Sequence, residues 1–218
     1  MNKKRNNRWA FPVVMLSAFL VWTILVRIVD LQPIGPGGSA VGFATINDKV
    51  HQFTGVNFEL YLLTDWLGVV PFVVALGFGV LGLTQWMKRG SVKKVDLDIL
   101  FLGGFYLAVL FVYVIFEVVV INHRPVLIDG VLEVSYPSST TMLVMCVMPT
   151  AMIQWRKRIR HESWRKWGMI LASAFTVFMI VGRLLSGVHW VTDIIGGMLL
   201  SIGLVGMYLY TCSINCRE

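Results

Sequence analysis

The chain has 218 residues, of which 56% are hydrophobic and 14% carry a charge, and its mean hydropathy is +0.72. This composition excludes an ordinary soluble domain and indicates a protein that crosses the membrane several times. The formal net charge of +7 does not favour nucleic-acid binding, because the basic residues gather in short segments between apolar runs.

Six apolar stretches are candidates for transmembrane helices, since a span needs about 20 apolar residues. We place them at residues 9–29, 65–87, 97–121, 141–155, 168–185 and 190–211. The fourth stretch is short by this measure, and we expect it to begin earlier, in the Ser and Thr residues that precede it. No internal repeat is evident, so the sequence predicts an all-α bundle of six helices that forms a single domain over residues 1–218.

The basic residues predict how the chain crosses the membrane. With the N-terminus in the cytoplasm, the inner segments hold 15 of the 19 Lys and Arg residues, as the positive-inside rule requires. We therefore expect a multi-pass protein of the cell membrane with both termini in the cytoplasm. The first apolar stretch has no clear small-residue cleavage site, so we expect it to be retained as an anchor. The three cysteines, Cys146, Cys212 and Cys216, give no disulfide framework.

An outer segment, residues 32–64, separates the first two spans. Its Pro and Gly residues predict a loop. Apolar residues then recur at helical spacing, which predicts a short amphipathic helix that Ser39 and Gly55 bound. Two roles stay open for this helix, shaping lipid entry from the outer leaflet or serving only as a connector. We expect His51, which lies in it, at the surface.

Two further outer segments hold ionisable residues at membrane depth, where such groups are costly and often functional. His189 and Asp193 are four residues apart, so on a helix the carboxylate can orient the imidazole. The other ring nitrogen is then available as a nucleophile. Arg124 and Arg183 carry planar guanidinium groups that suit phosphate oxygens. The hydroxyl-rich residues 138–141 begin the fourth span with free backbone N–H groups and a helix dipole. Together these residues predict a phosphate site on the outer face.

Three motifs carry a family resemblance. The chain has "RP" at residues 124–125, "PSS" at 137–139 and "GRLLSGVHWVTD" at 182–193. In this order they resemble the type 2 phosphatidic acid phosphatase superfamily of membrane lipid phosphatases, with a motif core at about residues 117–193. The resemblance implies hydrolysis of a lipid phosphate with no metal and no other cofactor. It also implies roles for six groups: His189 attacks phosphorus to form a phosphohistidine, Asp193 orients His189, and Arg124, Arg183, Ser138 and the amide of Ser139 bind the phosphoryl oxygens.

Three positions depart from the family pattern. Glu117 stands where a lysine is expected, Gly182 where a serine is expected, and Thr140 where a histidine acts as general acid. Because Thr140 cannot supply a proton near neutral pH, we expect turnover to be slowed. The loss should differ between substrates, because it depends on how much the leaving group needs a proton. A diphosphate lipid of the isoprenoid-carrier type releases a phosphate with a pKa of about 6, whereas an alkoxide needs the proton to leave. The sequence therefore predicts a preference for a lipid diphosphate.

Several alternatives remain open at this point. Glu117 and His123 are candidates to replace the missing acid, and Glu117 is also expected to pair with Arg124, seven residues further on. A non-catalytic lipid-phosphate binding protein and a phosphotransferase compete with the hydrolase, although the intact pair of His189 and Asp193 favours catalysis. A small transporter is disfavoured because no inverted repeat is visible. We expect a lipid substrate and the bilayer as partners and no nucleic acid, and the oligomeric state stays open.

Overall fold

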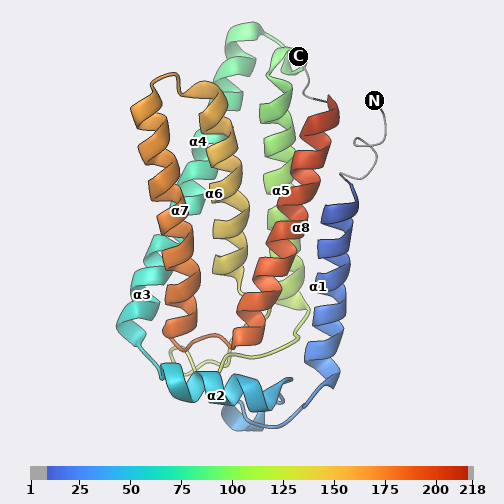
Figure 1. Cartoon of the computed structure of the whole chain (residues 1–218), viewed down its shortest axis with the longest axis vertical. Coiled ribbons are helices and arrows are strands. Elements are labelled where there is room, and N and C mark those ends of the chain that lie inside the picture. Colours follow the sequence, from blue (N-terminus) through green and yellow to red (C-terminus); the bar gives the residue numbers. More distant parts are fainter. Residues whose placement is uncertain (1–8, 216–218) are drawn as a thin grey trace.

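The computed structural model describes residues 9–215 and folds them into a bundle of long helices (Figure 1). The long helices are α1 (Ala10–Ile28), α4 (Val69–Arg89), α5 (Leu97–Val118), α6 (Ser139–Arg158), α7 (Glu162–Leu185) and α8 (Val191–Asn215). Helix α2 (Ala44–Thr54) lies across one end of the bundle, and α3 (Phe58–Leu67) leads from it into α4. Two short 3-10 turns are present, at Pro36–Gly38 and Val92–Lys94. The part of the chain from 9 to 215 contains no β-strand, only isolated bridges.

Among the described residues, five segments are long and apolar enough to cross a membrane. They are α1, α5, α7, α8 and the continuous stretch Phe58–Arg89 that α3 and α4 form together. The predicted second span, residues 65–87, was therefore too short, because the helix already begins at Phe58 and is interrupted only at Gly68.

Helix α6 is the sixth long helix and differs from the others in polarity. It begins at Ser139, earlier than residue 141, as expected from the Ser and Thr residues there. Its composition alone does not mark it as a span, and ten of its 20 residues are buried. It packs against α4, α7 and α8, and its polar side chains bond inside the bundle. For example, Gln154 Nε2 donates to Tyr208 Oη at 2.9 Å.

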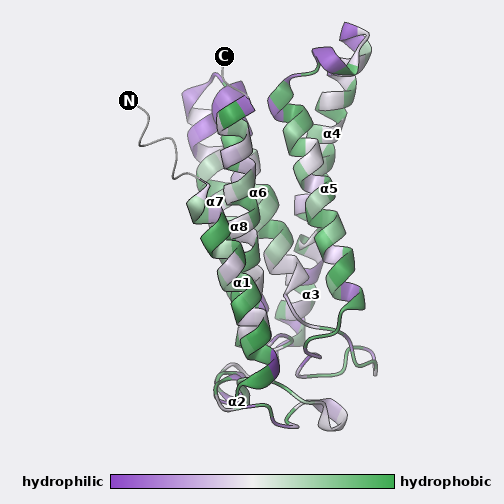
Figure 2. Cartoon of the chain, turned by 90° about the vertical axis from the view of Figure 1, so that its right-hand side faces the viewer, coloured by the Kyte–Doolittle hydropathy of each residue, from purple (hydrophilic) through white to green (hydrophobic). Residues whose placement is uncertain are grey.

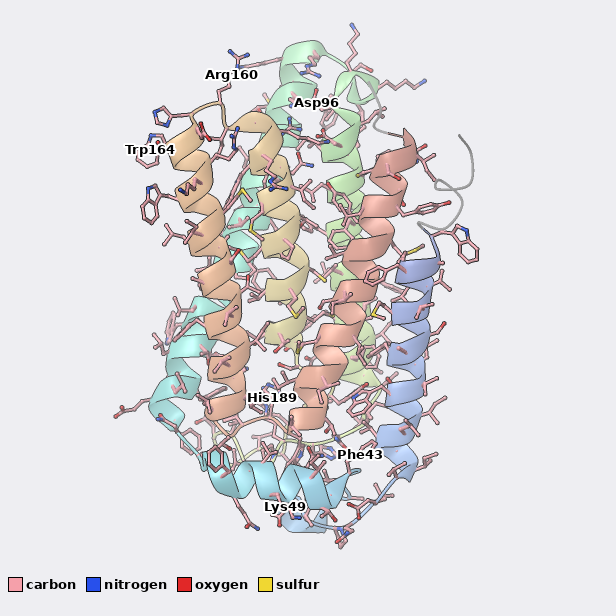
Figure 3. The ribbon with its side chains drawn as sticks, viewed as in Figure 1. Phe43, Lys49, Asp96, Arg160, Trp164 and His189 are labelled. Carbon is pink, nitrogen blue, oxygen red and sulfur yellow. The ribbon has the colours of Figure 1, made fainter. Side chains whose placement is uncertain are left out.

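The two ends of the bundle differ in charge. Asp96, Arg160 and Trp164 lie at one end, together with the α4–α5 and α6–α7 connections, and His189 lies at the other (Figure 3). Hydrophilic residues are concentrated at the first end (Figure 2). We call this end the basic end and the other, with His189, the site end. The predicted inner segments at residues 1–8 and 216–218, with Cys216, lie outside the described residues.

Two neighbouring glycines of α8 let the segment before α6 pack closely against it. A Cβ atom on Gly196 would lie 2.6 Å from the Tyr136 ring, and one on Gly197 would lie 3.0 Å from the Ser138 carbonyl oxygen. Neither glycine could be replaced without moving Tyr136 or Ser138. The close contact that a glycine pair permits is thus made within this chain, and it fixes the start of α6 beside the start of α8.

Candidate active site

A cavity of about 550 Å³ opens at the site end of the bundle. Its wall is formed by residues from α3, α5, the connection that precedes α6, the first turns of α6, the end of α7 and the turn before α8. Six of the nine residues predicted from sequence line it: Glu117, Arg124, Ser139, Thr140, Arg183 and His189. The other three, His123, Ser138 and Asp193, do not line it.

His189 and Asp193 are both buried and face each other. His189 Nδ1 lies 3.7 Å from Asp193 Oδ2, which is beyond hydrogen-bond distance but places the carboxylate on the Nδ1 side of the ring. Asp193 is itself held by two donors: the Trp190 amide donates to Oδ2 at 3.0 Å and Asn122 Nδ2 donates to Oδ1 at 3.4 Å. The carboxylate is therefore fixed, and Nε2 is the ring nitrogen on the side away from it.

The surroundings of His189 keep its imidazole neutral. Burial lowers the pKa of His189 well below its usual value of 6.5, and the positive charges of Arg124 and then Arg183 lower it further. The Ser135 backbone opposes these effects more weakly. Neither ring nitrogen has a hydrogen-bond partner among the described residues. A neutral imidazole has a basic lone pair, so His189 is suited to nucleophilic attack at neutral pH.

Two buried arginines lie close to the ring of Tyr61 at the cavity wall. The Cζ atoms of Arg124 and Arg183 lie 5.8 Å and 5.2 Å from the centre of the Tyr61 ring, within cation–π distance. Arg183 Nη1 also lies 3.4 Å from Asp65 Oδ1. Buried nitrogens of both arginines, Nε and Nη1 of Arg124 and Nε of Arg183, have no hydrogen-bond partner in the described part of the chain. Two of these, Nη1 of Arg124 and Nε of Arg183, also form no ion pair with a described carboxylate, and they are donors that phosphoryl oxygens can use.

The ion-pair partner of Arg124 differs from the expected one. Helix α5 ends at Val118, so Glu117 and Arg124 do not share a helix and their spacing of seven has no structural meaning. Instead, Arg124 Nε lies 2.9 Å from Glu133 Oε2, as an ion pair without an aligned hydrogen bond. The Arg124 amide donates to the Glu133 carbonyl oxygen at 3.0 Å and brings the two residues together. The sequence did not reveal Glu133, because this contact depends on how the connection folds.

His123 and Glu117, the two candidates for a replacement acid, are placed differently. Glu117 lines the cavity. The His123 side chain does not, and its carbonyl oxygen accepts a hydrogen bond from Trp190 Nε1 at 2.8 Å. His123 therefore links the connection before α6 to the turn that carries His189, and of the two candidates only Glu117 lies on the cavity wall.

The hydroxyl cluster forms the first turn of α6. Ser139 and Thr140 line the cavity, where the first amides of a helix have no intrahelical acceptor and the helix dipole is positive. Ser138, the residue before the helix, is fully buried. Its amide donates to the Asp193 carbonyl oxygen at 3.1 Å, and its hydroxyl is not on the wall. Ser138 thus joins α6 to α8, and its contact with a phosphoryl oxygen stays a prediction.

The departure at Gly182 has a packing explanation. A Cβ atom on Gly182 would lie 2.8 Å from Thr64 Cγ2 of α3. A serine at this position would therefore push α3 away from α7. The glycine allows α3, which carries Tyr61, to approach the Arg183 side chain.

Helix α2 holds the turn on which His189 lies. Asn47 is fully buried, and its Nδ2 donates to Thr192 Oγ1 at 3.0 Å while its Oδ1 accepts from the Thr192 amide at 3.3 Å. His51 Nε2 lies 3.1 Å from the Gly187 carbonyl oxygen. His51 is half-buried, so the expectation that it is a surface residue was only partly right, because α2 packs its polar face onto this turn.

The predicted start of that helix was also wrong, whereas its end was right. Helix α2 begins at Ala44 and not near Ser39, because residues 32 and 41 pair in an isolated bridge and Phe43 adopts φ 50°. It ends before Gly55, as expected.

Replacing Gly187 with alanine is expected to reduce activity by about 100-fold or more, because misplacement of a reacting group by about 1 Å has an effect of that size. Gly187 has φ +68°, and its Cβ would lie 1.9 Å from the Gly55 carbonyl oxygen, so the turn before His189 must move. The measurement is phosphate release by the purified variant. Gly37→Ala is a matched control, since Gly37 has φ +65° but nothing within 4 Å of a Cβ. Equal activity in the two variants would contradict this role of the turn.

Comparison with known proteins agrees with the fold and the motifs. The family model of the PAP2 superfamily matches residues 98–215, more than half of the chain, and the protein therefore belongs to that superfamily. No match was found among curated proteins. A solved structure described as the first transmembrane PAP2 type phosphatidylglycerolphosphate phosphatase from Bacillus subtilis has the same fold. Its TM-score is 0.60 at 20% sequence identity, over 95% of this chain and 98% of that chain.

Proposed function

We propose that the protein is a membrane lipid phosphatase that works through a phosphohistidine on His189 and prefers a lipid diphosphate of the isoprenoid-carrier type. One observation carries the proposal: a buried imidazole with a lowered pKa lines the same cavity as two arginines with unpaired N–H groups. A nucleophile beside preformed donors for phosphoryl oxygens is what phosphoryl transfer requires.

In the first step, His189 Nε2 attacks the terminal phosphorus of the lipid. An N–P bond forms as the bond from phosphorus to the bridging oxygen breaks, and the electron pair leaves with that oxygen. Arg124, Arg183 and the first amides of α6 stabilise the charge on the equatorial oxygens. The Asp193 carboxylate stabilises the imidazolium that forms.

In the second step, water attacks the phosphorus from the side opposite to Nε2. The N–P bond breaks and its electron pair returns to Nε2, so His189 is neutral again, and the proton that the water loses leaves on the inorganic phosphate. The nucleophile, the group that stabilises it and the donors to the phosphoryl oxygens are all side chains or backbone amides of this chain, and the scheme includes no metal ion or other cofactor.

The preference for a diphosphate follows from the residues on the wall. Thr140 lies where the family pattern has an acidic imidazole, and Thr140 has no proton to give near neutral pH. A lipid monophosphate leaving from a diphosphate needs no proton, because its phosphate has a pKa of about 6. Glu117 also lines the cavity and is our candidate for weak acid assistance. The name of the similar Bacillus protein favours a phosphate monoester lipid as the second candidate substrate.

We further propose that the site end faces outward and the basic end faces the cytoplasm. The basic end carries the charged α4–α5 and α6–α7 connections, and such loops are retained on the cytoplasmic side. In this orientation the cavity opens to the outer leaflet, where a carrier lipid is recycled after it delivers its cargo.

The test is phosphate release by purified protein from an isoprenoid diphosphate and from phosphatidic acid, with detection of phosphohistidine in the same samples. Faster release from the diphosphate together with a phosphohistidine would support the proposal. Faster release from phosphatidic acid would overturn the substrate preference. A phosphohistidine without released phosphate would indicate a phosphotransferase. If the protein binds lipid but forms neither product, it is a lipid-phosphate binding protein.

Activity is expected to persist to lower pH than an ordinary histidine would allow. Protonation removes the nucleophile, and because the pKa of His189 is lowered, this loss occurs well below pH 6.5. Burial is the largest cause and Arg124 the second. In Arg124→Met the acid limb of kcat/KM should therefore move to higher pH, whereas Arg124→Lys should keep it nearly in place. The substrate ionises in the same way whichever variant is measured, so its own pKa does not affect the difference between the pH profiles. An unchanged acid limb in Arg124→Met would contradict the electrostatic effect.

A further inference from the structure

A second large hollow runs along the side of the bundle and reaches the basic end. It is an apolar groove of about 660 Å³ between α4, α5 and α6. Its wall includes Phe72, Trp86, Val95, Ile99, Leu107 and Val147. A volume of this size lies within the range of about 300–1,000 Å³ that is typical of ligand sites.

Glycines on facing helices create this groove. Gly79 of α4 and Gly103 and Gly104 of α5 line it, and a Cβ atom on any of the three would meet nothing within 4 Å. The groove is therefore open space that larger side chains would fill without a clash. Gly77 of α4 also has open space around it but does not line the groove.

At the basic end the groove adjoins a charged pocket. This pocket, which we call the basic pocket, has a volume of about 590 Å³ and shares Val95 with the groove. Five basic side chains and two carboxylates line it: Arg89, Lys93, Lys94, Lys157, Arg158, Asp96 and Asp98. One continuous surface thus passes from positively charged at the end of the bundle to apolar along its side.

The carboxylates neutralise only part of the positive charge. Asp96 pairs with Arg89 at 2.8 Å, and Asp98 pairs with Arg158 at 2.8 Å and with Lys157 at 3.2 Å. The other two basic residues, Lys93 and Lys94, form no ion pair with a described residue. The Lys157 side chain keeps 47% of its surface exposed despite its ion pair. Positive groups are therefore accessible at the mouth of the groove.

We propose that the groove and the basic pocket together bind an anionic phospholipid of the leaflet at the basic end. The phosphate group lies against Lys93, Lys94 and Lys157, and the acyl chains lie along α4, α5 and α6. The order of charged and apolar surface along the bundle matches that of a phospholipid in its leaflet, and basic pockets between membrane helices suit anionic head groups. The basic pocket lies at the end opposite to His189, and the proposal does not depend on the proposed phosphatase activity.

The test measures the thermal unfolding midpoint of detergent-purified protein with added dioleoyl phosphatidylglycerol, dioleoyl phosphatidylcholine or inorganic phosphate. We expect phosphatidylglycerol alone to raise the midpoint, by several degrees. The shift should be lost in Lys93→Gln/Lys94→Gln, which removes the unpaired charge, and in Gly103→Leu, which fills the groove. Gly77→Leu makes the same change on a helix face outside the groove and should keep the shift.

Several results would overturn the proposal. An equal shift with inorganic phosphate would show a soluble-anion site, and an equal shift with phosphatidylcholine would show lipid contact without charge recognition. A shift that survives in both Lys93→Gln/Lys94→Gln and Gly103→Leu would place the lipid elsewhere. If Gly103→Leu does not fold, Lys93→Gln/Lys94→Gln remains as the test, since it changes side chains outside the core. Native mass spectrometry then measures the phosphatidylglycerol that each protein retains, and equal retention by this variant and the natural protein would overturn the proposal.

Discussion

His189→Ala is expected to lower phosphate release from lipid diphosphate and lipid monophosphate alike by about 10⁴-fold or more, because removal of a nucleophile leaves only binding and electrostatic effects. Asp193→Asn should cost about 10²–10⁴-fold, since the amide no longer stabilises an imidazolium charge. No phosphohistidine should form in His189→Ala. The measurement is release of inorganic phosphate under conditions of lipid excess.

His161→Ala serves as a control, because His161 precedes α7 at the basic end and lies outside the cavity. It should retain the wild-type rate. Release by His189→Ala at the wild-type rate would contradict the mechanism outright. A variant that still binds lipid diphosphate but does not cleave it would separate loss of chemistry from loss of folding, since the arginines and the first turn of α6 remain in place.

The sequence predicted the parts of the molecule that depend on local patterns. Apolar runs marked α1, α4, α5, α7 and α8, because a membrane span requires about 20 apolar residues, whereas α6 is too polar for its composition alone to mark it as a span. The i, i+4 spacing of His189 and Asp193 predicted their approach, although Nδ1 and Oδ2 lie 3.7 Å apart. The boundary error at α2 arose where the positive φ of Phe43 decides the helix start. The second span was placed too late because α3, which begins at Phe58, runs on into α4.

The contacts that complete the cavity could not be predicted, because they join residues that are distant in sequence. Tyr61 lies close to both arginines, and the close approach of α3 to α7 that brings it there depends on the small size of Gly182. Glu133 pairs with Arg124 through the fold of the connection before α6. The polar residues on one face of α2, Asn47 above all, were the signal that this helix packs onto the protein and not only onto lipid.

Thr140→His is expected to raise phosphate release from phosphatidic acid by about 10²–10⁴-fold, the usual contribution of general acid catalysis, and to change release from an isoprenoid diphosphate little. Thr140 lines the cavity in the first turn of α6, so an imidazole there faces the same space as His189. It can give its proton to the alkoxide as the P–O bond breaks. Thr140→Asn adds a polar side chain without a proton to donate near neutral pH and should leave both rates near the wild-type values.

The same comparison also tests Glu117 as the substitute acid. If Glu117 supplies the proton in the natural protein, Glu117→Gln should slow cleavage of phosphatidic acid more than cleavage of the diphosphate, and Thr140→His should restore the lost rate. An unchanged rate in Glu117→Gln would leave Glu117 as a wall residue only. An equal gain in rate on both lipids in Thr140→His would show that the histidine improves phosphate binding and not proton transfer. The missing acid would then not explain a preference for the diphosphate, and that proposal would be wrong.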